Sequence, residues 1–234
     1  MVTLTFHGHA CWEVQGSQHR ILIDPFLTGN ATFEDAGIPL HKAVNGVTHV
    51  ALTHGHEDHT GDTVRICKET AAQLLAVHEL ATYMAGRGVD KVDPGNTGGT
   101  LYHGDFELTF VPAWHSASHI VDGRPVYLGA CCGLVIATSG GRTVYHMGDT
   151  GIFSDMGLVN ENYRPQIGFV PIGDRYTMGA KTAALACKRF FEFELIVPCH
   201  YRTFPVLDQT ADKFIEEMHS DSVLVPEVGV AFEA

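Results

Sequence analysis

The sequence lacks the features that mark membrane-inserted, secreted and low-complexity chains. No apolar run among its 234 residues is long enough to span a bilayer, and the first residues contain no basic segment followed by an apolar signal core. Pro/Ser-rich tracts and sustained heptads are also absent. We therefore expect one cytoplasmic domain over residues 1–234, with no membrane partner and with a homo-oligomer left open.

Positive charge is scarce. The chain has 15 Lys and Arg against 27 Asp and Glu, which gives a formal net charge of −12 at pH 7. Because proteins bind nucleic acid backbones mainly through Lys and Arg contacts that release counterions, this balance disfavours nucleic acid as a partner. A small, anionic substrate gripped directly by metal ions fits the composition better.

Two catalytic or redox motifs are also missing. The six cysteines show no CxxC spacing and lie mostly in apolar surroundings, which indicates reduced thiols that fill the core. No GxSxG nucleophile elbow occurs, which argues against a serine hydrolase. The chemistry is therefore expected from other residue types.

The most informative feature of the chain is a cluster of histidines. Residues 53–62 read THGHEDHTGD, so that His54, His56, Asp58 and His59 place four metal-capable side chains within six positions. The preceding apolar run at 49–53 predicts a buried strand, and the cluster would lie on the loop at its carboxyl end. Mixed His and Asp donors without thiolate indicate a catalytic rather than a closed structural site.

Three isolated candidates extend this cluster. His115, Asp149 and His200 each follow or end a strand-like run, so they would project from the same kind of sheet edge. With the first four residues they make five imidazoles and two carboxylates, enough for two metal ions if one carboxylate bridges them. Two adjacent cations can share and acidify one water molecule and stabilise charge on the substrate.

Periodicity predicts a mixed α/β or α+β chain. Helical patterns cover residues 62–70, 79–86, 178–191 and 208–219. Strand-like runs cover residues 2–6, 11–14, 20–24, 48–53, 74–77, 100–112, 127–138, 143–146, 166–172, 194–198 and 222–230. Hairpin-like neighbours in the middle of the chain favour antiparallel or mixed sheets, and two facing sheets with helices outside would bury this much apolar strand.

The motifs resemble the metallo-β-lactamase superfamily: HxHxDH at 54–59, a later lone His, GDT at 148–150 and a last His after a strand. Finer matches resemble a bacterial group of metal-dependent hydrolases related to the ascorbate-6-phosphate lactonase branch. They are GHA at 8–10, IDPFLTGN at 23–30, NTGGT at 96–100, PAWHS at 112–116, YHMGDTGIFSDM at 145–156, PIG..YTMG at 171–179 and HYRTFP at 200–205.

The resemblance implies a four-layer αββα sandwich with two metal ions at one edge of the sheets. One ion would be held by His54, His56 and His115. The other would be held by Asp58, His59 and His200, with Asp149 bridging the two. True β-lactamases usually have a cysteine in their second metal site where this chain offers Asp149, so antibiotic hydrolysis is disfavoured.

Two residues are expected to support the ligands, and two others to take part in proton transfer. The resemblance places Asp24 under the site, where it would brace the ligand loop and fix ligand direction. His146, three residues before Asp149, is a weaker candidate for the same kind of support. Asp58, or His9 through water, would pass a proton to the leaving group; His9 is equally well explained as a hydrogen-bonded core residue.

Five residues near the last ligand could bind an anionic group of the substrate as a set, or simply decorate the surface. They are Arg175, Tyr176, Lys181, Tyr201 and Arg202.

The function predicted is hydrolysis of a small ester-like substrate, a lactone or a phosphoester, by a hydroxide shared between two divalent metal ions. Zn and Mn come first, and Fe and Ni also suit these donors. Two alternatives stay open: a phosphodiesterase or nuclease with the same two ions, and a sensing or binding protein that holds metal without turnover.

Overall fold

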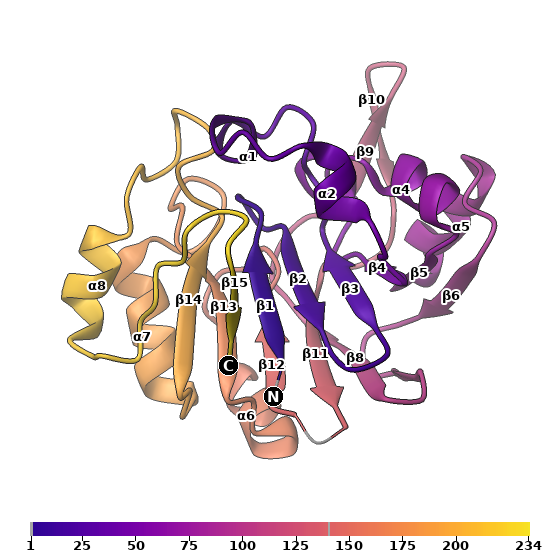
Figure 1. Ribbon diagram of the computed structural model, residues 1–234. Coiled ribbons are helices and arrows are strands. Elements are labelled where there is room, and N and C mark those ends of the chain that lie inside the picture. Colours follow the sequence, from indigo (N-terminus) through magenta and orange to yellow (C-terminus); the bar gives the residue numbers. More distant parts are fainter. Residues whose placement is uncertain (1, 140) are drawn as a thin grey trace.

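The computed structural model describes residues 2–139 and 141–234, and its first sheet has seven strands (Figure 1). In spatial order the strands are β15 (Ala231–Glu233), β1 (Thr3–Phe6), β2 (Trp12–Gln15), β3 (Arg20–Ile23), β4 (His49–Ala51), β5 (Gln73–Val77) and β6 (Val92–Gly95). The strands from β15 to β3 pair antiparallel, and those from β3 to β6 pair parallel.

The second sheet has six strands and is also mixed. Its order is β14 (Leu195–Cys199), β13 (Ile167–Pro171), β12 (Thr143–His146), β11 (Cys132–Thr138), β8 (Phe106–Pro112) and β7 (Thr100–Tyr102). A separate two-stranded hairpin, β9 (Ser118–Val121) and β10 (Arg124–Tyr127), projects from the body at the upper right of Figure 1.

Helices cover both sheets, which confirms the expected four-layer arrangement of helices and two mixed sheets. The first sheet is accompanied by α1 (Ala31–Asp35), α2 (Leu40–Val44), α4 (Thr63–Thr70) and α5 (His78–Gly86). The second is covered by α6 (Met156–Tyr163), α7 (Ala180–Phe190) and α8 (Asp212–Met218). The short helix α3 (Glu57–Thr60) belongs to the histidine-rich loop.

The main core lies between the sheets. The rings of Trp12 and Phe169 stack across it with centroids 4.0 Å apart, and both side chains are fully buried. A second core lies under α6, α7 and α8. It includes the Ala183 and Cys187 side chains, which belong to the apolar stripe predicted for α7. All six cysteines are buried and unpaired, as predicted.

Three predicted strand runs differ from the structure. The run at 100–112 is divided by a turn at Gly104, whose φ is 69°, and β11 begins only at Cys132 after Gly129 with φ 90°. The run at 222–230 is wrong, because among the described residues it forms one isolated bridge, between Val223 and Ile196. Pro226 lies within this run, and a proline cannot donate to a ladder.

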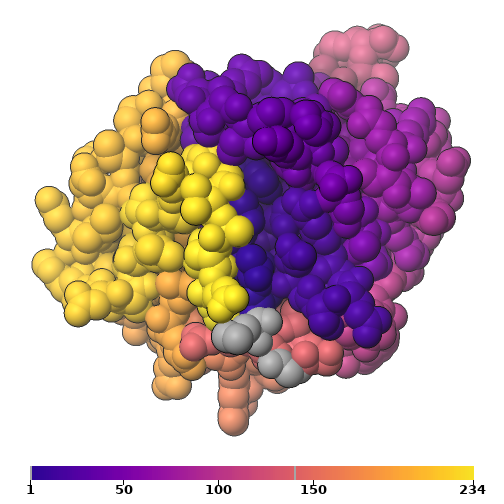
Figure 2. Space-filling view, viewed as in Figure 1, coloured from indigo at the N-terminus to yellow at the C-terminus, as the bar shows by residue number. Residues whose placement is uncertain are grey.

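The two ends of the described chain lie side by side. In Figure 2 the C-terminal segment, in yellow, runs along the indigo N-terminal residues, and β15 pairs with β1 in antiparallel register. None of the described helices has the length and apolar character needed for a bilayer span.

Candidate metal centre

Each candidate ligand follows the carboxyl end of a strand. The first four lie on the loop after β4, where His56 is the N-cap of α3, and the other three follow β8, β12 and β14. These strand ends meet at one edge of the two sheets, so residues up to 146 positions apart in sequence converge there, as from His54 to His200. The parallel pairing of β12, β13 and β14 aligns the last two of these ends.

One carboxylate oxygen lies at the middle of the cluster. Asp149 Oδ2 is 3.0 Å from His200 Nε2 and 3.4 Å from His59 Nε2. The same oxygen is 3.6 Å from His115 Nε2 and 4.0 Å from His54 Nε2. Four imidazole nitrogens from three different segments therefore surround a single oxygen atom.

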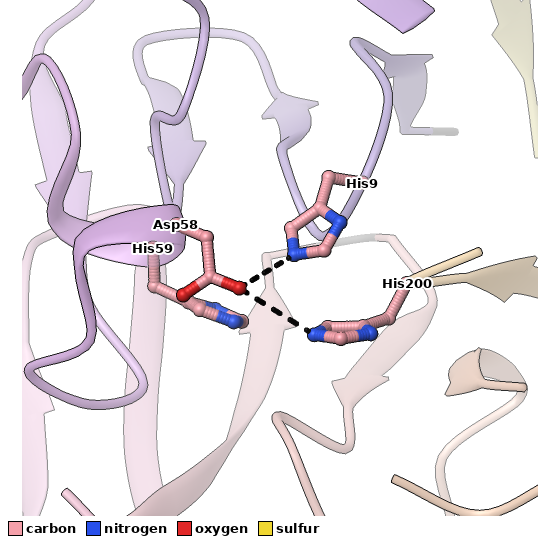
Figure 3. A group of neighbouring side chains, drawn as sticks. All are labelled: His9, Asp58, His59 and His200. Carbon is pink, nitrogen blue, oxygen red and sulfur yellow. Dashed lines mark hydrogen bonds and ion pairs between the residues drawn. The ribbon is translucent and has the colours of Figure 1, made fainter. Parts of the chain in front are cut away.

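The donors on either side of Asp149 form two groups. We call His54, His56 and His115 the histidine group; their donor atoms lie within 4.8 Å of one another. We call His9, Asp58, His59 and His200 the mixed group, which meets the same distance limit (Figure 3). The mixed group includes His9, which the sequence indicated as a proton-transfer residue rather than as a donor beside the ligands.

The donor set fits divalent metal ions. Asp149 Oδ1, His59 Nε2 and His200 Nε2 are buried, yet none makes a hydrogen bond of acceptable geometry with the described residues. An unsatisfied buried polar group costs about 1–3 kcal/mol, and a bound cation would satisfy all three of these converging atoms. Imidazole and carboxylate donors at one point are the ligands that Zn, Mn, Fe and Ni accept.

The charges around Asp149 are arranged to keep it ionised. Burial alone would raise the pKa of Asp149, but His200 and His59 hold that pKa well below its ordinary value. Burial would likewise lower the pKa of His59, whereas the carboxylates of Asp149 and Asp24 raise it well above its ordinary value. Positive charge is therefore favoured at His59, between these two carboxylates, whereas burial and the neighbouring His200 lower the pKa of His9 to about 4.

The histidine group behaves differently. Burial, followed by the nearby His59, lowers the pKa of His54 well below its ordinary value. Burial also lowers the pKa of His56 and of His115. All three imidazoles are therefore neutral at pH 7, and their lone pairs are available to a metal ion.

Asp24 lies directly beneath the ligand loop. Its Oδ2 accepts hydrogen bonds from His59 Nδ1 at 2.7 Å and from Thr53 Oγ1 at 2.6 Å, and its Oδ1 accepts from the Thr53 backbone N–H at 2.8 Å. With Nδ1 of His59 donating to this carboxylate, Nε2 is the nitrogen that faces the cluster. The side chain of Asp24 is fully buried, so these contacts are not shared with solvent.

His9 approaches the cluster from the turn between β1 and β2. Its Nε2 donates to Asp58 Oδ2 at 3.1 Å, and its ring centroid is 4.0 Å from that of His200. The rings of Phe26 and Phe204 meet it edge-on at 5.7 and 5.4 Å. His9 is fully enclosed, whereas 29% of the Asp58 side chain is exposed, so only Asp58 of this pair can meet solvent or substrate.

His146 contacts none of the seven candidate ligands by hydrogen bond. Its Nε2 donates to the carbonyl oxygen of Ala10 at 2.9 Å, and its Nδ1 accepts from the Gly148 N–H at 3.0 Å. This buried imidazole therefore joins the turn after His9 to the segment that leads into Asp149. Burial keeps its pKa below the ordinary value.

Three site residues have left-handed backbone conformations that favour glycine. The φ angles are 55° at His9, 44° at Asp24 and 54° at His200. Each such residue costs about 1–3 kcal/mol unless its surroundings enforce it. The turns are held by neighbouring backbone, since the His200 N–H donates to the carbonyl oxygen of His9 at 2.8 Å.

Two supporting hydroxyls were missed in the sequence. Thr150 is fully buried after Asp149, and its Oγ1 accepts from the Trp114 N–H at 3.0 Å. Ser116 Oγ lies 3.5 Å from His56 Nε2. Their roles depend on contacts between distant segments, for which a single Ser or Thr in a loop provides no signal.

The five residues expected to grip an anion do not form one set. Tyr201 is 7% exposed and packs in the core under α7 and α8. Lys181 and Arg202 line two different grooves. Arg175 and Tyr176 remain exposed on the loop between Gly173 and Gly179, which adjoins the candidate metal centre.

Comparisons with known sequences identify the family of the chain. The family model described as a beta-lactamase superfamily domain matches residues 19–201. A UPF0173 metal-dependent hydrolase of Chelativorans sp. (strain BNC1) is 52% identical over 230 residues, which cover 97% of this chain and 97% of that protein. A second one, from Brucella anthropi, is 53% identical over 216 residues, covering 92% of this chain and 91% of that protein.

Solved structures show the same fold. Igni18, a metallo hydrolase from Ignicoccus hospitalis KIN4/I, matches with a TM-score of 0.86 and 32% identity over 100% of this chain and 99% of that chain. An isothiocyanate hydrolase from Delia radicum gut bacteria matches with a TM-score of 0.76 and 19% identity over 99% and 98%, a likeness of fold alone. The chain belongs to the metallo-β-lactamase superfamily and, within it, to the UPF0173 metal-dependent hydrolase family.

Proposed function

We propose that this metal-dependent hydrolase uses two divalent metal ions to hydrolyse a small ester-like substrate, a lactone or a phosphoester. Family membership supports hydrolysis with metal. The observation that carries the two-ion site is the position of Asp149 Oδ2, which has imidazole nitrogens within 4.0 Å on both sides. A single oxygen so placed can serve two ions at once.

Each ion would have its own set of ligands. The histidine group of His54, His56 and His115 would hold one ion, and Asp58, His59 and His200 would hold the other, with Asp149 reaching both. Zn and Mn are the ions we favour for these donors, and Fe and Ni also suit them. When bound, two adjacent divalent ions acidify a water molecule and stabilise negative charge on a substrate oxygen.

The protein's own contribution is to fix the ligands before substrate arrives. Asp24 accepts from His59 Nδ1, and this contact sets the ring so that Nε2 faces the centre. We also assign a supporting role to His146, which ties the turn at Ala10 to the segment before Asp149. Such contacts behind a ligand typically change metal affinity or activity about 10–100-fold.

Proton transfer to the leaving group is assigned to Asp58. His59 and His9 hold the pKa of Asp58 well below its ordinary value, so its partly exposed carboxylate would take up the proton that the attacking water releases and pass it to the leaving oxygen. His9 is enclosed and would act only through Asp58. The hydrogen bond from His9 Nε2 holds Asp58 Oδ2 in place, so His9 is a positioning residue in this scheme (Figure 3).

The test is metal-dependent turnover with matched histidine variants. Protein is stripped with a chelator, reloaded with Zn or Mn, and assayed with a lactone, a phosphodiester and a thioester. We expect turnover in the reloaded wild type and in His103→Ala, whose histidine lies at the opposite edge of the sheets. In His56→Ala we expect a loss of more than about 100-fold, because a ligand is removed rather than a group behind one.

The other outcomes are also decisive. Turnover that is unchanged in the stripped sample would overturn metal-dependent hydrolysis. Hydrolysis of the phosphodiester alone would favour a phosphodiesterase, and tight metal binding without turnover of any ester would favour a sensing or binding protein.

A further inference from the structure

We infer that Trp114, Arg175 and Tyr176 form a recognition rim around the metal centre, which selects an ester with an oxyanionic group next to an apolar portion. This inference rests on the proposed hydrolase function and names the substrate class of the same site. It depends on how two exposed segments are fastened to the residue that follows Asp149.

Thr150 fastens both segments. Its Oγ1 accepts the Trp114 N–H at 3.0 Å, and its carbonyl oxygen accepts the Met178 N–H at 3.1 Å. The Gly151 N–H also donates to the carbonyl oxygen of Trp114 at 3.2 Å, so two hydrogen bonds hold Trp114 to this segment. The segments that carry Trp114 and Tyr176 are therefore tied to the same fully buried threonine, one position after the central carboxylate.

The loop that carries Arg175 begins at Gly173, which contacts the candidate ligand His200. Gly173 packs so tightly on His200 that an added side chain would collide with the carbonyl oxygen of His200. Gly173 and Gly179 form an antiparallel bridge, and the Asp174 N–H donates to the carbonyl oxygen of Met178 at 3.2 Å. Because two residues span at most about 7 Å, Arg175 is held close to the centre.

The positive charge of Arg175 has no ionic partner among the residues that the structure describes. Its exposed guanidinium makes no ion pair or hydrogen bond with the described residues. By contrast, Lys181 shares its groove with carboxylates such as Asp208, and Arg202 shares its groove with Glu227. In a chain of net charge −12, an unpaired guanidinium beside the site is the group that can bind a carboxylate or phosphate with two parallel hydrogen bonds.

The apolar part of the inference comes from two aromatic side chains. Trp114 is 72% exposed and Tyr176 is 58% exposed, although the backbone of the Trp114 segment is fully fastened. Aromatic rings held at the mouth of a polar site provide flat apolar surface for a ligand. The rim therefore combines one cation with two aromatic faces.

The test uses a matched pair of probes, benzoate and its neutral analogue benzamide. Their dissociation constants are measured by calorimetry with zinc-loaded wild type, Arg175→Ala, Arg175→Lys and the control Arg189→Ala, which removes an exposed charge at the far end of α7. We expect the preference for benzoate over benzamide to fall about tenfold to hundredfold in Arg175→Ala, the usual effect of losing a charge-assisted hydrogen bond. We expect the preference for benzoate in Arg175→Lys to lie between the values for wild type and Arg175→Ala. Arg189→Ala should keep the wild-type preference.

A second arm tests the aromatic faces and separates this inference from hydrolysis itself. Trp114→Ala should weaken both probes by a similar factor, with metal content unchanged by elemental analysis. An unchanged benzoate preference in Arg175→Ala, or unchanged binding in Trp114→Ala, would overturn the recognition rim even if esters are hydrolysed. Failure to hydrolyse any ester, with the binding preference present, would instead overturn the hydrolase function and leave the anion site standing.

Discussion

Two histidine clusters lie at opposite edges of the sheets, and their nitrogens face different surroundings. At the carboxyl ends of the strands, four Nε2 atoms converge on Asp149. At the amino ends of β3 and β4, a distal cluster of His19, His49 and His103 packs on Phe106, with ring centroids 4.8, 4.9 and 5.1 Å from that ring. The first cluster directs its nitrogens at one oxygen atom, whereas the distal cluster packs its rings around Phe106.

Each distal histidine has one nitrogen near a polar atom of its own, and the three polar atoms belong to different residues. His19 Nδ1 lies 2.9 Å from Asp105 Oδ2, and His103 Nε2 lies 3.1 Å from Asp93 Oδ2. His49 Nδ1 lies 2.9 Å from the neighbouring Thr48 Oγ1. None of the three belongs to a metal-capable group found among the described residues. Convergence of donors on one point, rather than histidine content, distinguishes a metal site from packed histidines.

The largest effect is expected from Asp149→Ala. Removal of the shared carboxylate should abolish tight binding of both ions and lower turnover by more than about 100-fold, because a direct ligand matters more than a group behind one. His103→Ala, in the distal cluster, should keep wild-type metal content. Elemental analysis after dialysis measures both, and equal metal content in the two variants would break the distinction between the clusters.

Asp24→Ala should have the next largest effect. The His59 ring would lose its acceptor at 2.7 Å, so we expect metal affinity to fall about 10–100-fold without loss of a ligand. Metal titrations of the folded variant, checked by circular dichroism, measure this effect. Full metal content under limiting metal would show that Asp24 only stabilises the fold.

His9 tests the same principle with a smaller change. His9→Phe should lower kcat about tenfold, the lower end for a lost supporting hydrogen bond, because Asp58 Oδ2 loses its donor at 3.1 Å. His9→Asn, which retains an N–H donor, should restore part of this loss. If both variants are equally slow and equally stable, the contact with Asp58 is not the reason for the effect.

The smallest effect is expected in the distal cluster, as a change of stability with pH. Burial, with help from His103 and His19, lowers the pKa of His49 to about 4. Below a pH of about 6.5, His49 binds a proton in the unfolded chain but stays neutral in the folded protein. The free energy of unfolding therefore decreases as the pH falls from 6.5 to 4. His49→Gln has no such proton and should escape this loss.

Because His49 is only partly buried, solvent screening limits its contribution to about 1 kcal/mol. Urea denaturation of wild type and His49→Gln at pH 7 and pH 4.5 measures it. A difference in unfolding free energy that is the same at both pH values would contradict the prediction.

The sequence predicted long elements better than short ones. The stripe through Ala183 and Cys187 in α7 was correct because eleven residues cover three turns of a helix. The helices α1, α2 and α3 have five, five and four residues, too few to show a period, and none was predicted. The wrong strand at 222–230 contains Pro226 and Gly229, which prevent regular pairing in a run that otherwise reads as a strand.

The site was partly visible in the sequence for a related reason. Donor types and their place after strands identified the residues that now surround Asp149, since strand ends share an edge. The supporting contacts of Thr150, Ser116 and Ala10 could not be predicted, because each joins segments that only the fold brings together. For the same reason, the sequence could not show that Lys181 and Arg202 lie in grooves that do not include Arg175.

The left-handed backbone at His9, Asp24 and His200 has a consequence for engineering the protein. Glycine would relax the backbone at all three corners, but each replacement would also remove a polar group from the candidate metal centre. A substitution chosen only to relieve backbone strain would therefore act against the site at these positions.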